Sequence, residues 1–434
     1  MKFYSTNDSK RVVNLQEAII NGLAPDNGLY MPERIPVFKP EFFNSLSEKS
    51  FQEIAFDVAQ AFVEDDISAE QLKKIIAHTI AFDAPLVEIE KNVFALELFH
   101  GPTLAFKDFG ARFMSQVLGH FAQQQKREIV ILVATSGDTG SAVANGFLGV
   151  PGTRVVVLYP SGKVSEIQEK QFTTLGKNIT AVEINGTFDD CQRFVKQAFL
   201  DQELKASFFL TSANSINIAR LIPQSFYYFY AWSRLPRRKN VVFSVPSGNF
   251  GNLTAGLIAK KMGLPIHHFI AATNINDIVP HYLTTNNFLP KPSISTISNA
   301  MDVGNPSNFV RMLDLFDQDY RAMKREITGY SFTDEDIRVV MRNVFSKFNY
   351  TLDPHGTIGY LGLKKYQSQN TESTGVFLET AHPAKFLDVV ESALKTKISV
   401  PSQLASFLER HKSSIPCSAD FNSFKNVLHE ILSL

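Results

Sequence analysis

Lys107 is the residue of this sequence best suited to covalent chemistry. It stands between Phe106 and Phe109 at the start of an expected helix, a few residues after the turn Gly101-Pro102. A lysine in water, with a pKa of about 10.4, is uncharged in only about one molecule in a few thousand at pH 7. Apolar surroundings and a helix N-terminus both favour the uncharged amine, which can form an imine with an aldehyde. The alternative is a lysine that covers apolar neighbours with its methylene groups and keeps its ammonium group in water.

A glycine-rich loop over residues 247–252 joins an expected strand to an expected helix. In such a loop backbone N–H groups point outward, and the helix dipole adds about half a positive charge. The loop contains no lysine or arginine, so a phosphate bound there would have to be held by amides. The alternative is a tight strand–helix turn without a ligand. The candidate residues of this anion site are Gly248, Asn249, Phe250, Gly251 and Asn252.

A second loop of the same kind covers residues 134–141, again between an expected strand and an expected helix. Its hydroxyls and amides suit a small anion such as an α-carboxylate. Asp138 would repel an anion, so we expect its side chain to turn away and cap the helix. Because open α/β sheets place ligands at the carboxyl ends of their strands, both loops should open at such ends. The candidate residues of the second site are Ser136, Gly137, Asp138 and Thr139.

Other common chemical motifs are absent from the sequence. Gly162-Lys163 is followed by Val164 and does not complete a nucleotide-binding P-loop. Neither loop has the Gly-x-Gly-x-x-Gly pattern of dinucleotide sites, and no Gly-x-Ser-x-Gly elbow of a serine hydrolase occurs. The two cysteines, Cys191 and Cys417, form no pair pattern, and no Cys/His cluster has metal-ligand spacing. We therefore expect no bound metal.

The elements that must position these loops follow an α/β pattern. Between residues 87 and 272, short β-branched runs alternate with amphipathic stretches, which favours a parallel sheet with helices on both faces. A further strand–helix unit at 376–394 is expected to complete this sheet, whereas the pattern before residue 87 is mainly helical. We predict an α/β protein with doubly wound, mostly parallel sheets in two lobes and a mainly helical N-terminal region. The expected ranges are 1–86 for this region, 87–235 for the first lobe, and 236–434 for the second lobe with its C-terminal helices.

The composition excludes several classes of partner. The 434 residues include 43 Lys and Arg and 43 Asp and Glu, so the net charge is zero and no global field attracts nucleic acid or an anionic membrane. The first residues lack the apolar core of a signal peptide, and no stretch approaches the ~18 apolar residues of a membrane helix. We expect a cytoplasmic protein with no nucleic-acid or membrane partner.

Several long segments, taken together and in order, resemble threonine synthases along essentially the whole chain. The resemblance is to the bacterial and fungal branch of that family, which has a helical N-terminal extension. The matching segments are Gly22-Leu-Ala-Pro-Asp-Asn-Gly28, Phe99-His-Gly-Pro-Thr-Leu-Ala-Phe-Lys107-Asp, Ala134-Thr-Ser-Gly-Asp-Thr-Gly140, Ser212-Ala-Asn-Ser-Ile-Asn-Ile-Ala-Arg220, Pro246-Ser-Gly-Asn-Phe-Gly-Asn252, Ser298-Asn-Ala-Met-Asp-Val303 and Phe377-Leu-Glu-Thr-Ala-His-Pro-Ala-Lys385-Phe.

This resemblance implies a fold-type II enzyme that uses pyridoxal 5'-phosphate. Lys107 matches the lysine that forms the Schiff base with the cofactor, and it is the catalytic residue that we expect. The 248–252 loop matches the cup for the cofactor phosphate, and Thr380 matches the hydroxyl partner of the pyridine nitrogen. A threonine hydroxyl holds a proton on that nitrogen less firmly than a carboxylate would, which leaves the cofactor a weaker electron sink.

The resemblance also implies a substrate, O-phospho-L-homoserine, which a lyase of this family converts with water to L-threonine and phosphate as the last step of threonine biosynthesis. The 136–139 loop matches the segment that receives the substrate carboxylate, and Asn214, Ser215 and Arg220 match residues that hold the substrate phosphate. A guanidinium suits this role because it can grip a phosphate with two parallel hydrogen bonds. On its own, Arg220 could equally be a surface charge on a helix.

Two alternatives to this interpretation remain. Another fold-type II enzyme, such as a serine/threonine dehydratase, would share the cofactor and the layout but not the Asn214–Arg220 pattern or the long N-terminal region. A catalytically inactive relative that senses a phosphorylated metabolite would not need an intact Lys107 and Thr380. The sequence leaves open whether the protein is a monomer or a homodimer.

Overall fold

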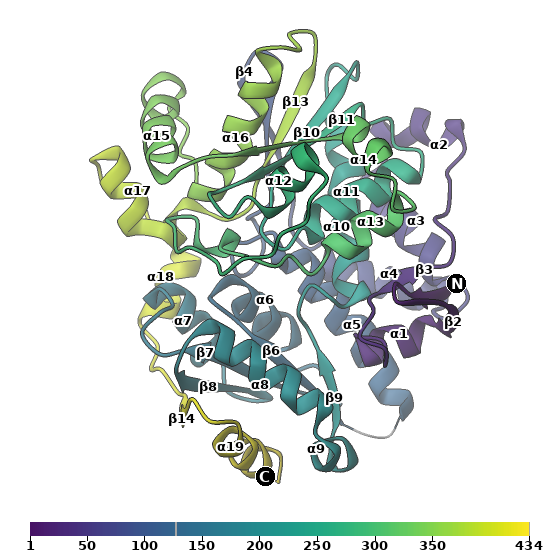
Figure 1. Cartoon of the computed structure of the whole chain (residues 1–434), viewed down its shortest axis with the longest axis vertical. Helices are drawn as coiled ribbons and strands as arrows, with labels where there is room; N and C mark the ends of the chain where they lie inside the picture. The colour runs from purple at the N-terminus through teal and green to yellow at the C-terminus, as the bar shows by residue number, and fades with distance from the viewer. Residues whose placement is uncertain (126–127, 434) are drawn as a thin grey trace.

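The structure is a computed structural model that describes residues 1–125 and 128–433. Figure 1 shows two sheet-containing halves, one above the other, with the N-terminal region at one side of both. The expected fold class is therefore confirmed: two mostly parallel sheets with covering helices, and an N-terminal region that is mainly helical.

The N-terminal region combines four α-helices with a small antiparallel sheet, whereas the sequence pattern predicted a mainly helical region. Side chains cap its helices: Asn14 accepts from the Glu17 amide, and Ser68 accepts from the Gln71 amide. The sheet has the order β2-β1-β3. Its elements are β1 (Lys2–Ser5), β2 (Asp8–Asn14), α1 (Leu15–Asn21), β3 (Tyr30–Pro32), α2 (Pro40–Ser45), η1 (Leu46–Glu48), α3 (Phe51–Val63) and α4 (Ala69–Thr79).

The lower sheet in Figure 1 is five-stranded and fully parallel, with the order β14-β8-β7-β6-β9. Its strands are β6 (Ile129–Ala134), β7 (Thr153–Pro160), β8 (Ile179–Asn185), β9 (Phe209–Ser212) and β14 (Ile415–Ser418). The helices that follow these strands are α6 (Asp138–Phe147), α7 (Glu166–Thr173), α8 (Phe188–Leu200), α9 (Gln202–Ser207), α10 (Ile218–Arg234) and α19 (Phe421–Ser433).

The upper sheet has six strands in the order β12-β11-β10-β13-β5-β4, and only the β4–β5 pair is antiparallel. Its strands are β4 (Leu86–Glu90), β5 (Val93–Glu97), β10 (Val241–Pro246), β11 (His268–Thr273), β12 (Ile327–Ser331) and β13 (Thr374–Glu379). The remaining helices are α5 (Lys107–Gln125), α11 (Gly251–Lys261), α12 (Ile278–Thr285), η2 (Asn299–Met301), α13 (Phe309–Leu315), α14 (Tyr320–Glu326), α15 (Asp334–Phe348), α16 (Pro354–Gln367), η3 (Pro383–Phe386), α17 (Leu387–Leu394) and α18 (Ser402–Leu408).

The two sheets divide the chain differently from the expected lobes 87–235 and 236–434. Strands β4 and β5 precede Lys107 but belong to the upper sheet, because β5 pairs with β13 along its whole length. Strand β14, close to the end of the chain, returns to the lower sheet and pairs with β8. The chain therefore crosses between the halves more often than contiguous ranges allow.

Helices of the N-terminal region brace the two helices that carry Lys107 and Arg220. Helix α4 packs on α5, and α3 packs on α10. Phe109 of α5 is fully buried and its ring contacts Phe82 at 4.8 Å between centroids, Tyr227 at 5.6 Å and Phe51 at 5.8 Å. Because these rings come from three parts of the chain, the N-terminal region and the central helices share one core.

Among residues 1–125 and 128–433, no helix combines the length and the apolar character needed to cross a membrane.

Replacing Phe109 with alanine should lower the free energy of unfolding by about 3–5 kcal/mol, because a fully buried aromatic ring is lost between three other rings. Urea denaturation followed by fluorescence measures this effect. Val37→Ala is the matched control, since Val37 is 72% exposed and its loss should change the stability by less than about 0.5 kcal/mol. Equal midpoints for the two variants would contradict this account of the core.

Candidate active site

The 247–252 loop and Thr380 leave the upper sheet side by side. Strands β10 and β13 are adjacent and parallel, with Ser244 paired to Phe377, so Ser247 and Thr380 follow their strands at equivalent positions. Neighbouring strands lie about 4.8 Å apart. The hydroxyl of Thr380 has no hydrogen-bond partner among the described residues, although the residue is only 6% exposed.

Backbone hydrogen bonds tie the segment before Lys107 to the segment after β13. The Phe106 amide donates to the Thr380 carbonyl at 2.9 Å, and the His382 amide donates to the Leu104 carbonyl at 3.0 Å. Ala105 and Ala381 form an isolated antiparallel bridge between these two bonds. These bonds therefore fix Lys107 beside the carboxyl end of β13. The 247–252 loop follows the carboxyl end of the adjacent strand β10.

The amine of Lys107 has no hydrogen bond or ion pair with any described residue, and its side chain is partly buried. Removal from water lowers the pKa of this amine to about 8; the Asp138 carboxylate opposes the shift, and the Lys385 and Arg220 cations add to it. At neutral pH a far larger fraction of such an amine is uncharged than of a lysine in water. An uncharged, unpaired amine can react with an aldehyde.

The 247–252 loop presents a row of unused backbone donors. The amides of residues 248–252 donate to no acceptor within the described chain, and α11 begins at Gly251. Phe250, the residue before the helix, adopts the left-handed conformation (φ 59°) and offers no side-chain cap. Free amides together with the positive end of a helix dipole are suited to an anion.

Only backbone atoms of Phe250 and Asn252 can contribute to that anion site. The Phe250 ring is 2% exposed and packs in the core. The Asn252 side chain closes the base of the loop: it donates to the Pro246 carbonyl at 2.8 Å and accepts from the Ser247 hydroxyl at 2.8 Å. These side chains hold the loop in shape and do not face a ligand.

The 136–139 segment is a second group of unused donors, at the start of α6. The amides of Ser136, Asp138 and Thr139 donate to no described residue, whereas the Gly137 and Gly140 amides donate to the Thr135 hydroxyl. Gly137 has a φ of 143°, and a Cβ there would lie 2.6 Å from the Gln168 side chain, so only glycine fits. The free amides of this segment are suited to a carboxylate.

The expectation that Asp138 caps α6 is wrong. Gly137 is the residue before the helix and provides no side-chain cap, and the Asp138 carboxylate instead forms an ion pair with Lys385, with 2.6 Å between Oδ1 and Nζ. Gln168 also donates to Oδ1 at 2.9 Å. Burial alone would raise the pKa of Asp138, but the Lys385 and Lys107 cations hold it well below its usual range. The carboxylate is thus charged and paired.

Arg220 is a buried guanidinium with capacity for an anion. It is 3% exposed, and its Nη1 donates to the Ala213 carbonyl at 2.5 Å, while its Nε has no partner. Burial lowers the pKa of Arg220 and Asp108 raises it, but the group stays charged at neutral pH. Gly110 of α5 makes room for it, since a Cβ there would lie 2.8 Å from Nε. The Arg220 side chain therefore packs against Gly110, about one helical turn along α5 from Lys107.

Asn214 and Ser215 link the two anion loops. Asn214 donates to the carbonyl of Ala134, at the end of β6, at 3.1 Å. The Ser215 hydroxyl accepts from the Asn249 side chain at 2.8 Å. These contacts place the Asn214–Ser215 segment between the end of β6 and the 247–252 loop.

Sequence reasoning missed Arg311 and Asn308 of the α13 segment. Arg311 is fully buried and donates to the carbonyls of Tyr30, Ser215 and Ile216 at 2.8–3.3 Å. Its Nη1 also donates to the Asn308 side chain at 2.7 Å. These contacts hold the Ser215 loop to the N-terminal region and place a second guanidinium behind the site. An arginine on a short helix gives no sequence signal for such a role.

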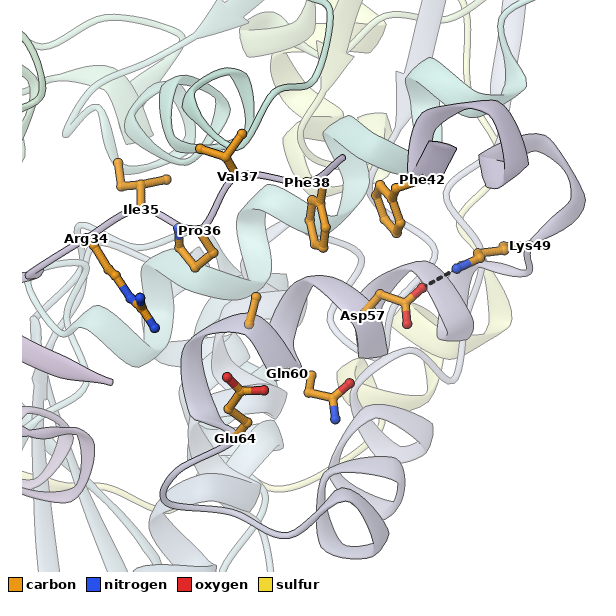
Figure 2. A pocket seen from close by; sticks show the side chains of 11 residues that line it. Arg34, Ile35, Pro36, Val37, Phe38, Phe42, Lys49, Asp57, Gln60 and Glu64 are labelled. Atoms are coloured by element: carbon orange, nitrogen blue, oxygen red, sulfur yellow. Dashed lines mark hydrogen bonds and ion pairs between the residues drawn. The ribbon is translucent and has the colours of Figure 1, made fainter. Parts of the chain in front are cut away.

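A surface depression of about 650 Å³ lies elsewhere, between α3 and the segment before α2 (Figure 2). Phe38 and Phe42 line it, together with Lys49 and Asp57, which form an ion pair at 2.5 Å. None of the expected site residues lines this depression, so it is not the site described above.

The chemistry of the donor set fits pyridoxal phosphate. Five consecutive free amides at a helix start suit its phosphate, an unpaired amine of lowered pKa suits its aldehyde, and a free threonine hydroxyl suits its ring nitrogen. The 136–139 amides and the Arg220 guanidinium could bind the two anionic groups of a second ligand.

Three family models match the chain. The threonine synthase N terminus matches residues 2–80, the pyridoxal-phosphate dependent enzyme family matches residues 77–380, and the threonine synthase C-terminal family matches residues 357–428.

Individual relatives agree over full length. Threonine synthase of Buchnera aphidicola subsp. Acyrthosiphon pisum is 45% identical, with 99% of this chain and 100% of the relative covered. The crystal structure of threonine synthase from Escherichia coli superposes with a TM-score of 0.93 at 44% identity and covers 99% of this chain and 100% of that chain. The structure of pyridoxal-phosphate-bound threonine synthase from Brucella melitensis gives the same TM-score at 34% identity, with 99% of both chains covered.

Matches of this identity and extent, on a site whose donors fit the cofactor, establish that the chain belongs to the threonine synthase family of pyridoxal-phosphate-dependent lyases.

Proposed function

We propose that this threonine synthase acts on O-phospho-L-homoserine and water to give L-threonine and phosphate, with Lys107 as its catalytic residue. The observation that carries the proposal is an unpaired lysine amine beside the carboxyl end of β13, where the adjacent strand β10 leads into five free amides. One molecule with an aldehyde and a phosphate could engage both.

The cofactor would be held by three parts of the chain. The amides of Gly248, Asn249, Phe250, Gly251 and Asn252 would bind its phosphate, Lys107 its aldehyde carbon, and the Thr380 hydroxyl its ring nitrogen. When bound, pyridoxal phosphate supplies an electron-withdrawing ring that stabilises negative charge on the carbon next to a substrate amine.

Lys107 would also move protons. Once the substrate amine replaces it, the Lys107 amine is released beside the substrate α-carbon and can take the proton from that atom. An amine whose pKa is about 8 suits this exchange, since a proton carrier works best when its pKa lies near the operating pH.

The two ends of the substrate would be bound by separate anion sites. The segment Ser136, Gly137, Asp138 and Thr139 offers three free amides for the α-carboxylate. Arg220 offers its guanidinium for the phosphate, and its contact with the Ala213 carbonyl places it next to Asn214 and Ser215. Ser215 also contacts Asn249 of the cofactor loop, so the substrate phosphate and the cofactor phosphate would be neighbours.

Three further expectations remain proposals. We propose that the enzyme acts in the cytoplasm, that it has no nucleic-acid or membrane partner, and that it is a monomer or a homodimer. The balanced charge of 43 Lys and Arg against 43 Asp and Glu supports the second of these.

Lys107→Ala should abolish turnover, with a loss of about 10³-fold or more, because the variant loses both the covalent anchor and the proton carrier. Phosphate release from phosphohomoserine measures the loss, and the absorbance of the desalted protein reports retained cofactor. Lys425→Ala, which removes a lysine paired with Asp201 on the outer helix α19, is the control and should retain both signals. Normal turnover by Lys107→Ala would reject the assignment.

Arg220→Ala should raise the KM for phosphohomoserine by about 10²-fold, because charge-assisted hydrogen bonds to the phosphate contribute about 1.5–3 kcal/mol each. Cofactor absorbance should persist, and Arg220→Lys should recover part of the affinity. Initial rates at varied substrate concentration separate KM from kcat. Use of phosphohomoserine by the variant as well as by the parent would exclude the phosphate role of Arg220. Formation of 2-oxobutyrate from threonine as the main reaction of the parent enzyme would instead contradict the proposed function.

A further inference from the structure

Lys385 and Asp138 form a buried ion pair next to the reactive amine. Their side chains are 0% and 4% exposed, and Nζ lies 2.6 Å from Oδ1. Lys385 also donates to the Thr103 carbonyl at 2.9 Å, which fixes its position. Taking two charges out of water costs several kcal/mol per ion, so a pair of this kind is weak evidence for stability alone.

The pair belongs to both halves of the site. Asp138 begins α6, within the 136–139 segment of the lower half, and Lys385 lies on η3, five residues beyond Thr380 in the upper half. Oδ1 of Asp138 receives both Lys385 and Gln168, whereas Oδ2 accepts no hydrogen bond from the described residues and is not sealed from solvent. Oδ1 is therefore bound to two donors, whereas Oδ2 has no donor among the described residues.

The charged groups around the Lys107 amine come from three elements. Asp138 of α6 is the anion that acts on it, and Lys385 of η3 and Arg220 of α10 are the cations. Asp108, next to Lys107 on α5, is buried, accepts two hydrogen bonds from Thr103, and acts on Lys385 and Arg220. Without Lys385, the Asp138 carboxylate would lose its direct partner, and Lys107 would be the cation left to attract it.

We propose that Lys385 is a positioning residue that holds the Asp138 carboxylate away from both the Lys107 amine and the free amides of the 136–139 segment. This inference rests on the proposed role of Lys107. It gives Lys385 two tasks: it keeps the amine free of a direct ion pair, and it offsets a negative charge that would otherwise repel the substrate carboxylate.

Electrostatics support the direction of the effect. Burial lowers the pKa of Lys107, Asp138 raises it, and Lys385 lowers it further. Removing the Lys385 charge removes one cause of the lowered pKa of Lys107. It also leaves Asp138, which raises this pKa, without its direct partner. The pKa of the Lys107 nitrogen should therefore rise, and the fraction of uncharged amine at neutral pH should fall.

The test compares four holoenzyme variants with the parent: Lys385→Met, Lys385→Arg, Asp138→Asn and the double variant Asp138→Asn/Lys385→Met. The first readout is the pH midpoint of the cofactor absorbance without substrate, which responds to protonation of the Lys107 nitrogen. The second is the acid limb of the kcat profile, which reports the Lys107 amine that the bound substrate has released. A lysine that merely fills space would move neither midpoint.

Lys385→Met should shift both midpoints upward by about one pH unit, since a freed opposite charge close to an ionisable group has at least this effect. Lys385→Arg keeps the cation and should stay within a few tenths of a unit of the parent. Asp138→Asn should shift the midpoints downward, and the double variant should lose the upward shift because no carboxylate remains to pair with Lys107.

Lys425→Met is the matched control: it breaks ion pairs with Asp201 and Glu203 far from the site and should leave the midpoints unchanged. Unchanged midpoints in Lys385→Met would overturn the inference; if that variant does not fold, unchanged midpoints in Asp138→Asn would overturn it instead. Loss of the wild-type cofactor signal in Lys107→Ala is required first, so a failure of the proposed function is recognised separately.

Discussion

The exclusion of water from one lysine amine, beside two buried cations, is the constraint on which this site depends. An amine in that setting gives up its proton more readily than one in water. Burial is the largest cause of the lowered pKa of Lys107, and the Lys385 and Arg220 cations add to it. Both cations are held by backbone carbonyls: Lys385 donates to that of Thr103, and Arg220 donates to that of Ala213.

The rest of the fold holds the Lys107 amine, the two cations and the free amides in place. Two sheets present the starts of α6 and α11 with their amides unpaired, and the chain satisfies its other polar groups around them. The N-terminal helices α4 and α3 pack on α5 and α10, so they fix the helices that carry the amine and the guanidinium. Arg311 connects this region to the substrate side through the Tyr30 and Ser215 carbonyls. In this chain the helical N-terminal region therefore supports the helices that carry Lys107 and Arg220.

Local signals in the sequence predicted the loops and most strand–helix units, because these depend on neighbours within a few residues. The glycine pattern of 247–252 and the β-branched run before 134 are examples. Long-range pairing was beyond such signals: β5 joins the sheet of β13, and β14 returns to the sheet of β8. The same limit applies to Asp138, whose partner Lys385 is 247 positions away, so that local reasoning favoured a helix cap. Buried ion pairs between distant segments follow from tertiary packing.

The most direct test of the central claim is to find which lysine bonds to the cofactor. Holoenzyme reduced with borohydride, digested and mapped by mass spectrometry would carry the cofactor on one peptide. The account predicts that the modified residue is Lys107 and that Lys385, buried in the same site, is unmodified. Label on Lys385, or on any lysine away from the 247–252 loop, would contradict it.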